Sequence, residues 1–161
     1  MKMLKKILIQ NFIMPKFDYC DIIYIHMNND LKNQLQKIQN ICVRFIYNLK
    51  KYDHISMFYI RLNWLKLEQR RLLHFGCLIY KMYLYNSPSY LTDMIVSTKN
   101  VHNHNTRSQL FIPQINNSFG KMMFKFYASQ FWNSIPMPIR KAPTFNIFKS
   151  QLIEYIINNL L

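Results

Sequence analysis

Apolar side chains recur at spacings of three and four residues along much of this chain, which is the pattern of amphipathic helices. The clearest run covers residues 30–49, where Asn28, Asn29 and Asp30 are candidate helix N-caps. The expected core face consists of Leu31, Leu35, Ile38, Cys42, Phe45 and Leu49. The opposite face consists of Asn33, Lys37, Asn40, Arg44 and Asn48. The pattern therefore predicts a helix with one face in the core and a polar, partly basic face in solvent.

Further helices are predicted over most of the chain. A helix over residues 1–14 should end at Pro15, because proline breaks a helix interior. The stretch 17–26 is apolar and β-branched and fits either a strand or a helix. The other expected helices are a short segment capped by Asp53, residues 66–85, a turn or two within 89–95, 118–131 capped by Ser118, and the C-terminal segment capped by Thr144. Pro136, Pro138 and Pro143 predict an extended link before that last helix.

These elements predict an all-α fold, an irregular bundle of about six helices with a long loop near residues 97–117. That loop is polar and lacks helical periodicity. It divides the chain into a helical region at 1–96, a linker at 97–117 and a helical tail at 118–161.

The charge balance points to the class of partner. The 161 residues include 21 Lys and Arg against 7 Asp and Glu, giving a net charge of +14. Such an excess favours a polyanionic partner, either nucleic acid or an anionic membrane surface. The two glycines, Gly76 and Gly120, are too few for a glycine-rich phosphate loop or a dinucleotide fingerprint.

Cysteine usage and the absence of long apolar runs bear on the cellular setting. Cys20, Cys42 and Cys77 are an odd, widely spaced set, which favours a reducing cytoplasmic or nuclear compartment over secretion. Polar residues interrupt the apolar run in 1–14, so an amphipathic helix is expected there instead of a signal peptide. No stretch approaches the length of a transmembrane helix. Membrane-surface binding through residues 1–14 remains an alternative.

Few residues suggest catalysis or metal binding. Asp18 and Asp21 would share one side of a helix and offer two carboxylates to a metal, but the sequence shows no third ligand. His102 and His104 form an H-x-H pair with no neighbouring Cys or carboxylate. His74 and Cys77 lie one turn apart in an apolar helix, where a core histidine is the simpler interpretation. We therefore predict no catalytic residue, metal site or cofactor.

The basic residues carry the main functional prediction. The candidate phosphate-binding side chains are Lys37, Arg44, Lys50, Lys51, Arg61, Arg70 and Arg71. Contacts of this kind orient a nucleic acid without reading its sequence. Tyr47, Tyr52 and Tyr59 are candidates for stacking on bases, although aromatic residues at helical spacing more often lie in a core.

Five segments in order resemble the region after the polymerase palm in non-LTR (LINE-like) retrotransposon reverse transcriptases. They are FDYCDIIY, LQKIQNICVRFIYN, LNWLKLEQRRLLHFGCLIYKMYLYNSPSYLTDMI, HNTRSQ and FWNSIPMPIRKAPTFNIFKSQL. The resemblance implies that 1–96 corresponds to the thumb, which would hold the template–primer duplex, with Lys37 and Arg44 on the thumb helix. It also implies partners in the palm and fingers, which this sequence lacks.

The resemblance implies a fragment of an RNA-directed DNA polymerase that binds RNA or an RNA–DNA duplex. The Y-x-D-D type motif of the family's palm is absent from this sequence, so we expect no enzymatic activity from the chain by itself. The alternative is a helical protein-interaction module or a relic recruited by its host, with no polymerase role.

Overall fold

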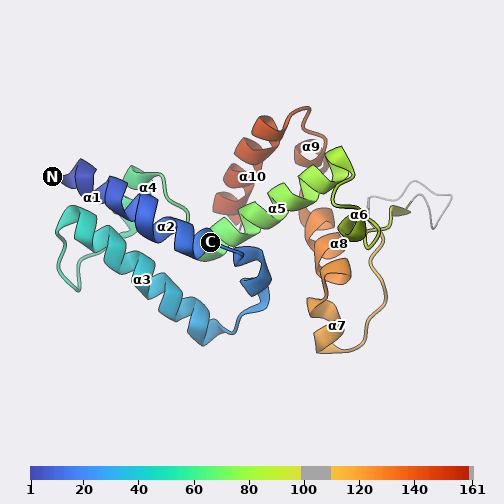
Figure 1. Cartoon of the computed structure of the whole chain (residues 1–161), viewed down its shortest axis with the longest axis horizontal. Coiled ribbons are helices and arrows are strands. Elements are labelled where there is room, and N and C mark those ends of the chain that lie inside the picture. The colour runs from blue at the N-terminus through green and yellow to red at the C-terminus, as the bar shows by residue number, and fades with distance from the viewer. Residues whose placement is uncertain (99–109, 160–161) are drawn as a thin grey trace. The chain divides into compact units, whose positions relative to one another are not determined.

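The helices seen in a computed structural model, which describes residues 1–98 and 110–159, fall into two units (Figure 1). Unit 1 covers Met1–His74 and unit 2 covers Phe75–Leu161. Unit 1 contains α1 (Lys2–Leu8), the π-helix η1 (Ile9–Ile13), α2 (Met14–Asp18), the 3-10 helix η2 (Asp21–His26), α3 (Asn29–Tyr47), α4 (Ser56–Leu62) and the start of α5 (Leu67–Tyr85). The units divide within α5, whereas the sequence suggested divisions near residues 96 and 117.

The first helix does not stop at Pro15, so that prediction is wrong. The chain stays helical from α1 through η1 to the end of α2, with Pro15 in the first turn of α2. Before the proline, the Met14 N–H bonds the Ile9 carbonyl, five residues back instead of four. A π-turn of this kind widens the helix locally and accommodates a residue that lacks an N–H donor.

The segment after α2 is helical and not a strand. Cys20 takes a left-handed conformation with φ of 53°, and η2 follows it.

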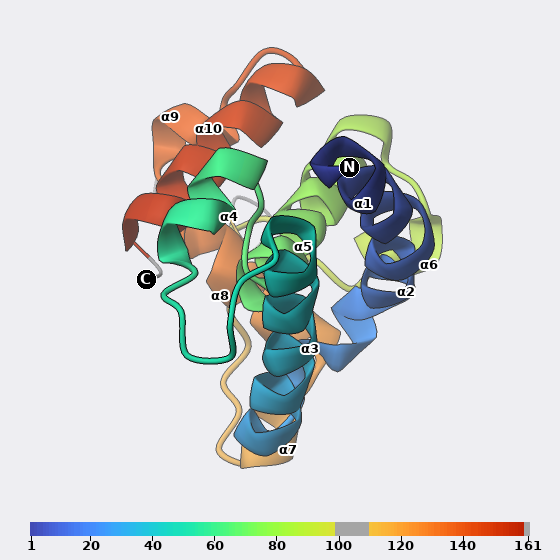
Figure 2. The same cartoon turned by 90° about the vertical axis from the view of Figure 1, so that its left-hand side faces the viewer.

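The α3 helix then begins as expected, because the Asn28 side chain accepts a hydrogen bond from the Leu31 N–H at 2.9 Å. It ends at Asn48, also left-handed, whose side chain accepts a hydrogen bond from the Lys5 ammonium of α1. Thus α1 lies beside α3 and tethers its C-terminal end (Figure 2).

The predicted core face of α3 is largely wrong. The buried side chains of α3 are Gln39, Cys42, Val43 and Ile46. Four apolar side chains are instead exposed: Leu31, Ile38, Ile41 and Phe45. We call these four the α3 apolar stripe. The helix is rotated about its axis relative to the sequence prediction, so that only Cys42 of the expected face is fully buried.

A network of amide side chains explains this rotation. Gln39 is fully buried, and its Nε2 donates to the Leu65 carbonyl at 2.9 Å. The Gln36 Oε1 accepts from the Leu67 N–H at 3.1 Å, while its Nε2 donates to the Tyr59 hydroxyl at 2.8 Å. The Tyr59 hydroxyl in turn donates to Asn40 at 2.7 Å. Buried polar groups require such partners, so these bonds hold the Gln36–Gln39 side of α3 against α4 and the start of α5.

The core of unit 1 packs around this network. It contains Met14, Cys42, Val43, Ile46, Tyr59, Leu62 and Trp64. Tyr47 of α3 and Phe58 of α4 pack at its margin with ring centroids 4.5 Å apart. Burial raises the pKa of the Tyr59 hydroxyl above its usual range, so this group remains a neutral hydrogen-bonding partner.

Unit 2 is built on the second part of α5, α8 (Phe124–Ser134) and α10 (Phe145–Asn159). Phe75 of α5 packs against Phe131 of α8 with ring centroids 5.3 Å apart. Gly76 permits close approach of α10, because a Cβ at this position would lie 2.5 Å from the Leu152 Cδ2. The predicted burial of the apolar part of 66–85 is confirmed as far as Met82, and Trp132 of the WNSIP stretch lies in the core.

The shorter helices of unit 2 refine the sequence predictions. The α6 helix spans Ser89–Thr92, α7 spans Ser118–Met122 and α9 spans Met137–Arg140. The helix expected over 118–131 is broken at Met123, and its cap is Asn117 and not Ser118. The proline-rich link is only partly extended, because Pro138 occupies the first turn of α9, where its missing N–H costs nothing. Thr144 caps α10 as expected, accepting from the Ile147 N–H at 3.4 Å.

The all-α fold class is confirmed. Within residues 1–98 and 110–159 the secondary structure is helical apart from an isolated bridge between Ser97 and Leu110. Residues 110–117 are not helical, as the long-loop prediction requires, and the rest of that loop from 99 to 109 lies outside the described residues.

The amide network generates a stability prediction. Gln39→Leu would fill the same space but leave the half-buried Leu65 carbonyl without its donor, so we expect a loss of about 2 kcal/mol in the free energy of unfolding. Urea denaturation measures this loss. Gln34→Leu is the control, because Gln34 is exposed on the same helix. A Gln39→Leu variant as stable as the parent chain would show that apolar packing alone orients α3.

Candidate nucleic-acid interface and a charged cluster

The predicted polar face of α3 is exposed only in part: Asn33, Lys37 and Asn48 lie in solvent, whereas Asn40 and Arg44 are half-buried. The Lys37 side chain is exposed and makes no ion pair within residues 1–98 and 110–159. Lys32, five residues earlier on α3, differs, because its ammonium binds the Glu68 carboxylate at 2.9 Å. Lys37 therefore offers an unneutralised charge to solvent, and Lys32 does not.

Arg44 shares the polar face but is partly committed to the fold. Its Nη2 approaches the Asp53 carbonyl at 3.5 Å, and its Nε is buried without a hydrogen-bond partner in the part of the chain that the structure describes. A half-buried guanidinium held against the loop after α3 has less freedom to reach a phosphate than Lys37 has. The sequence predicted that Lys37 and Arg44 share one exposed face. In the structure Lys37 is exposed and Arg44 is half-buried.

The chain turns sharply between α3 and α4, and this turn carries two further predicted cations. Lys50 and Lys51 are both exposed. The Asp53 N–H donates to the Lys50 carbonyl at 3.2 Å, and the Lys50 N–H donates to the Asp53 carboxylate at 2.7 Å. Asp53 was expected to cap the next helix, but it closes this turn instead, and α4 begins after Ile55.

The remaining predicted cations lie in different environments. Arg61 is exposed on α4, with its guanidinium 5.5 Å from the centre of the Phe58 ring. Arg70 is bonded through two nitrogens to the Asp18 carboxylate, at 2.7 and 2.5 Å. Arg71 is buried, with 5% of its surface exposed. The two α5 arginines therefore do not fit the prediction of surface phosphate contacts. Arg70 is already paired with Asp18, and Arg71 is buried.

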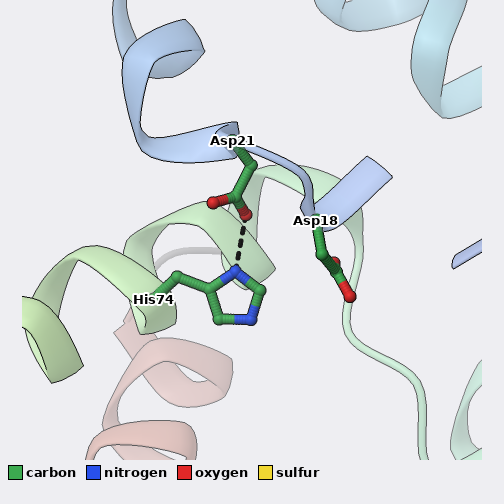
Figure 3. A group of neighbouring side chains, drawn as sticks. All are labelled: Asp18, Asp21 and His74. Carbon is green, nitrogen blue, oxygen red and sulfur yellow. Dashed lines mark hydrogen bonds and ion pairs between the residues drawn. The ribbon is translucent and has the colours of Figure 1, made fainter. Parts of the chain in front are cut away.

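Arg70 belongs to a cluster that the sequence did not reveal. Arg70 and His74 are four residues apart on α5 and face Asp18 and Asp21, which flank the left-handed Cys20. Figure 3 shows the His74 ring directed at the Asp21 carboxylate, with Asp18 beside this pair. The Asp21 Oδ2 lies 2.6 Å from the His74 Nδ1.

The cluster contains the third metal ligand that the sequence analysis lacked. One ligand atom each from Asp18, Asp21 and His74 lie within 4.8 Å of one another. Ligand atoms about 2.1 Å from a shared ion lie at most about 4 Å apart, so the group would have to contract around a metal. Moreover, Arg70 already binds both oxygens of Asp18. The arrangement is therefore best described as one ion pair and one hydrogen bond that link α5 to the end of α2 and the start of η2.

The possible Cys–His pair on α5 has no catalytic geometry. His74 is hydrogen-bonded to Asp21, as expected for a structural histidine. Burial raises the pKa of the Cys77 thiol, an effect that Lys149 and Lys81 oppose. Burial also raises the pKa of Cys42. Both thiols are therefore protonated at neutral pH, and neither is an activated nucleophile. His102 and His104 lie outside the described residues.

Comparisons with known proteins add no relative. No family model, no curated protein and no solved structure matches the chain. Over the residues that the structure describes, none of the helices combines the length and apolar character needed to cross a bilayer. The HNTRSQ motif lies outside the described part of the chain.

The charged cluster generates the first prediction about the site. His74→Gln would leave the buried Asp21 carboxylate without its imidazole partner, so we expect a loss of about 2 kcal/mol in unfolding free energy. Adding Asp21→Asn should recover much of that loss, because the buried charge is then removed. Urea denaturation of both single variants and the double variant gives the coupling energy. Additive effects would contradict a direct link between the two side chains.

Thiol labelling provides a second prediction. At neutral pH iodoacetamide should modify Cys20 first, because Cys20 is exposed, whereas Cys42 is buried and Cys77 half-buried. Since their pKa values are raised, Cys42 and Cys77 hold less thiolate at neutral pH, and their labelling should accelerate as the pH rises toward those values. Peptide mass mapping over time measures each rate. Labelling of Cys42 as fast as Cys20 would contradict the packing of α3.

Proposed function

We propose that this chain is the thumb and C-terminal portion of a non-LTR retrotransposon reverse transcriptase, which binds template–primer nucleic acid and has no polymerase activity by itself. The ordered sequence motifs support this proposal, and an all-α fold is compatible with it. The partner class is RNA or an RNA–DNA duplex, and the missing palm and fingers would supply the chemistry.

The observation that carries the proposal is the set of unpaired cations in unit 1. Lys37, Lys50, Lys51 and Arg61 are exposed, and none makes an ion pair within the described parts of the chain. They belong to α3, the turn after it and α4. Three of the five carboxylates of unit 1 are paired with other side chains: Asp18 with Arg70, Asp21 with His74, and Glu68 with Lys32. The other two, Asp30 and Asp53, are exposed, and neither forms an ion pair within the described parts of the chain. Free ammonium and guanidinium groups of this kind displace the counterions of a phosphate backbone.

The alternative function, a protein-interaction module, also has one supporting observation. The α3 apolar stripe exposes four large side chains, which is a feature of surfaces that bind another protein. In that case the basic side chains would serve solubility. Binding to an RNA–DNA duplex would then be no tighter than binding to a structureless polyanion such as heparin.

The proposal predicts a specific salt dependence for duplex binding. The slope of log K against log salt is negative. Lys37→Ala should make it less steep by about one unit, because one phosphate contact is lost. Fluorescence anisotropy of a labelled RNA–DNA duplex, measured over a series of salt concentrations, gives this slope. Lys32→Ala is the matched control on the same helix, and it should change the slope less because Glu68 already neutralises Lys32.

Two results would contradict the proposal. If Lys37→Ala and Lys32→Ala change the slope equally, α3 does not present its polar face to the phosphates. If heparin and the duplex compete at equal charge concentrations with equal strength, the protein-interaction alternative gains support over the polymerase fragment.

A further inference from the structure

The three tyrosines of unit 1 that were candidates for base stacking have different environments. Tyr59 is buried and bonded within the amide network. Tyr47 is half-buried against Phe58. Tyr52 is 87% exposed. Only Tyr52 among the three therefore presents its ring to a ligand in solution.

The backbone around Tyr52 is held in a closed turn. The Lys50 carbonyl and N–H both bond to Asp53, at 3.2 and 2.7 Å, so Lys51 and Tyr52 are the two central residues of the turn. The Asp53 carbonyl also lies 3.5 Å from the Arg44 Nη2, which ties the turn back to α3. The loop carrying this turn projects from α3 and α4 in both views (Figures 1 and 2). A ring presented on a fixed turn loses little further backbone entropy on binding.

The charges around Tyr52 match a nucleotide. Lys50 and Lys51 precede it, and the Lys51 ammonium lies 5.6 Å from the centre of the Tyr52 ring. Asp53 follows Tyr52 and accepts the Lys50 N–H through Oδ2, so two ammonium groups stand against one carboxylate at this turn. An exposed aromatic ring beside ammonium groups is the combination that binds single-stranded nucleic acid, in which the ring stacks on a base and the cations contact phosphates.

We propose that Tyr52 stacks on an unpaired base of bound RNA or DNA while Lys50 and Lys51 contact the adjacent phosphates. This inference rests on the proposed nucleic-acid function and specifies the form of the ligand. Bases within a duplex already stack on their neighbours, so Tyr52 requires a single-stranded stretch, such as the unpaired strand next to a duplex. The stacking is independent of base identity because each base offers an aromatic face.

The test uses fluorescence anisotropy with a short labelled oligo(dT) strand and a strand of equal length built from abasic residues. Tyr52→Ala should weaken binding to oligo(dT) about tenfold, the loss typical of one stacked base. Tyr52→Phe should bind like the parent chain, because the ring remains. On the abasic strand, Tyr52→Ala and the parent chain should bind equally.

The matched control is Tyr19→Ala. Tyr19 is also highly exposed in unit 1, at 77%, but it stands between the acidic residues Asp18 and Asp21 in place of two lysines. This substitution should leave oligo(dT) binding unchanged. The double substitution Lys50→Ala with Lys51→Ala should reduce the salt slope by about one to two, whereas Tyr52→Ala should leave the slope unchanged.

The outcomes separate the inference from the proposed function. If Tyr52→Ala binds oligo(dT) like the parent chain, or loses the same affinity on both strands, stacking by Tyr52 is overturned while nucleic-acid binding stands. If the parent chain binds neither the oligo(dT) strand nor the RNA–DNA duplex, the proposed function itself fails. A selective loss on the base-containing strand supports the inference.

Discussion

The buried amide of Gln39 determines how unit 1 presents itself to solvent. Gln39 bonds the Leu65 carbonyl and Gln36 bonds Leu67 and Tyr59, and both glutamines keep these partners only in the observed rotation of α3 or one close to it. That rotation places Cys42, Val43 and Ile46 in the core and turns Lys37 outward. The apolar stripe on α3 is exposed by the same rotation. The buried amide bonds and the core side chains Cys42, Val43 and Ile46 lie on the same side of α3, so the helix that carries the candidate interface leaves much of its apolar surface in solvent.

Ion pairs with acidic residues divide the cations of unit 1 into those that link helices and those that are free to bind a ligand. Residues 1–74 contain thirteen Lys and Arg but five Asp and Glu, so most cations have no acidic partner. Asp18, Asp21 and Glu68 bind Arg70, His74 and Lys32, and Asp53 closes the turn after α3. The paired cations thereby connect helices to one another. Among the cations without an acidic partner in the described residues, Lys37, Arg44, Lys50 and Lys51 lie on α3 and the turn that follows it, and α1 and α2 carry four more.

Local signals in the sequence predicted more of the fold than of the candidate site. Asn28 and Thr144 marked helix starts correctly, because a cap depends on residues within one turn. The core face of α3 was mispredicted, because apolar spacing cannot show that a glutamine is buried by partners more than twenty residues away. His74 bonds Asp21 and Arg70 bonds Asp18 across about fifty residues, contacts that no local pattern contains. Arg71 illustrates the same limit, since its burial depends on tertiary packing.

The exposed stripe on α3 gives ionic strength a double effect on this protein. At low salt, copies carrying a charge of +14 repel one another, and this repulsion opposes contact between their exposed leucine, isoleucine and phenylalanine side chains. Added salt shortens the range of that repulsion while leaving the attraction between apolar surfaces intact. The conditions that release a polyanion therefore also bring copies of the chain together, so colloidal stability is greatest when the cations are either unscreened or covered by a bound strand.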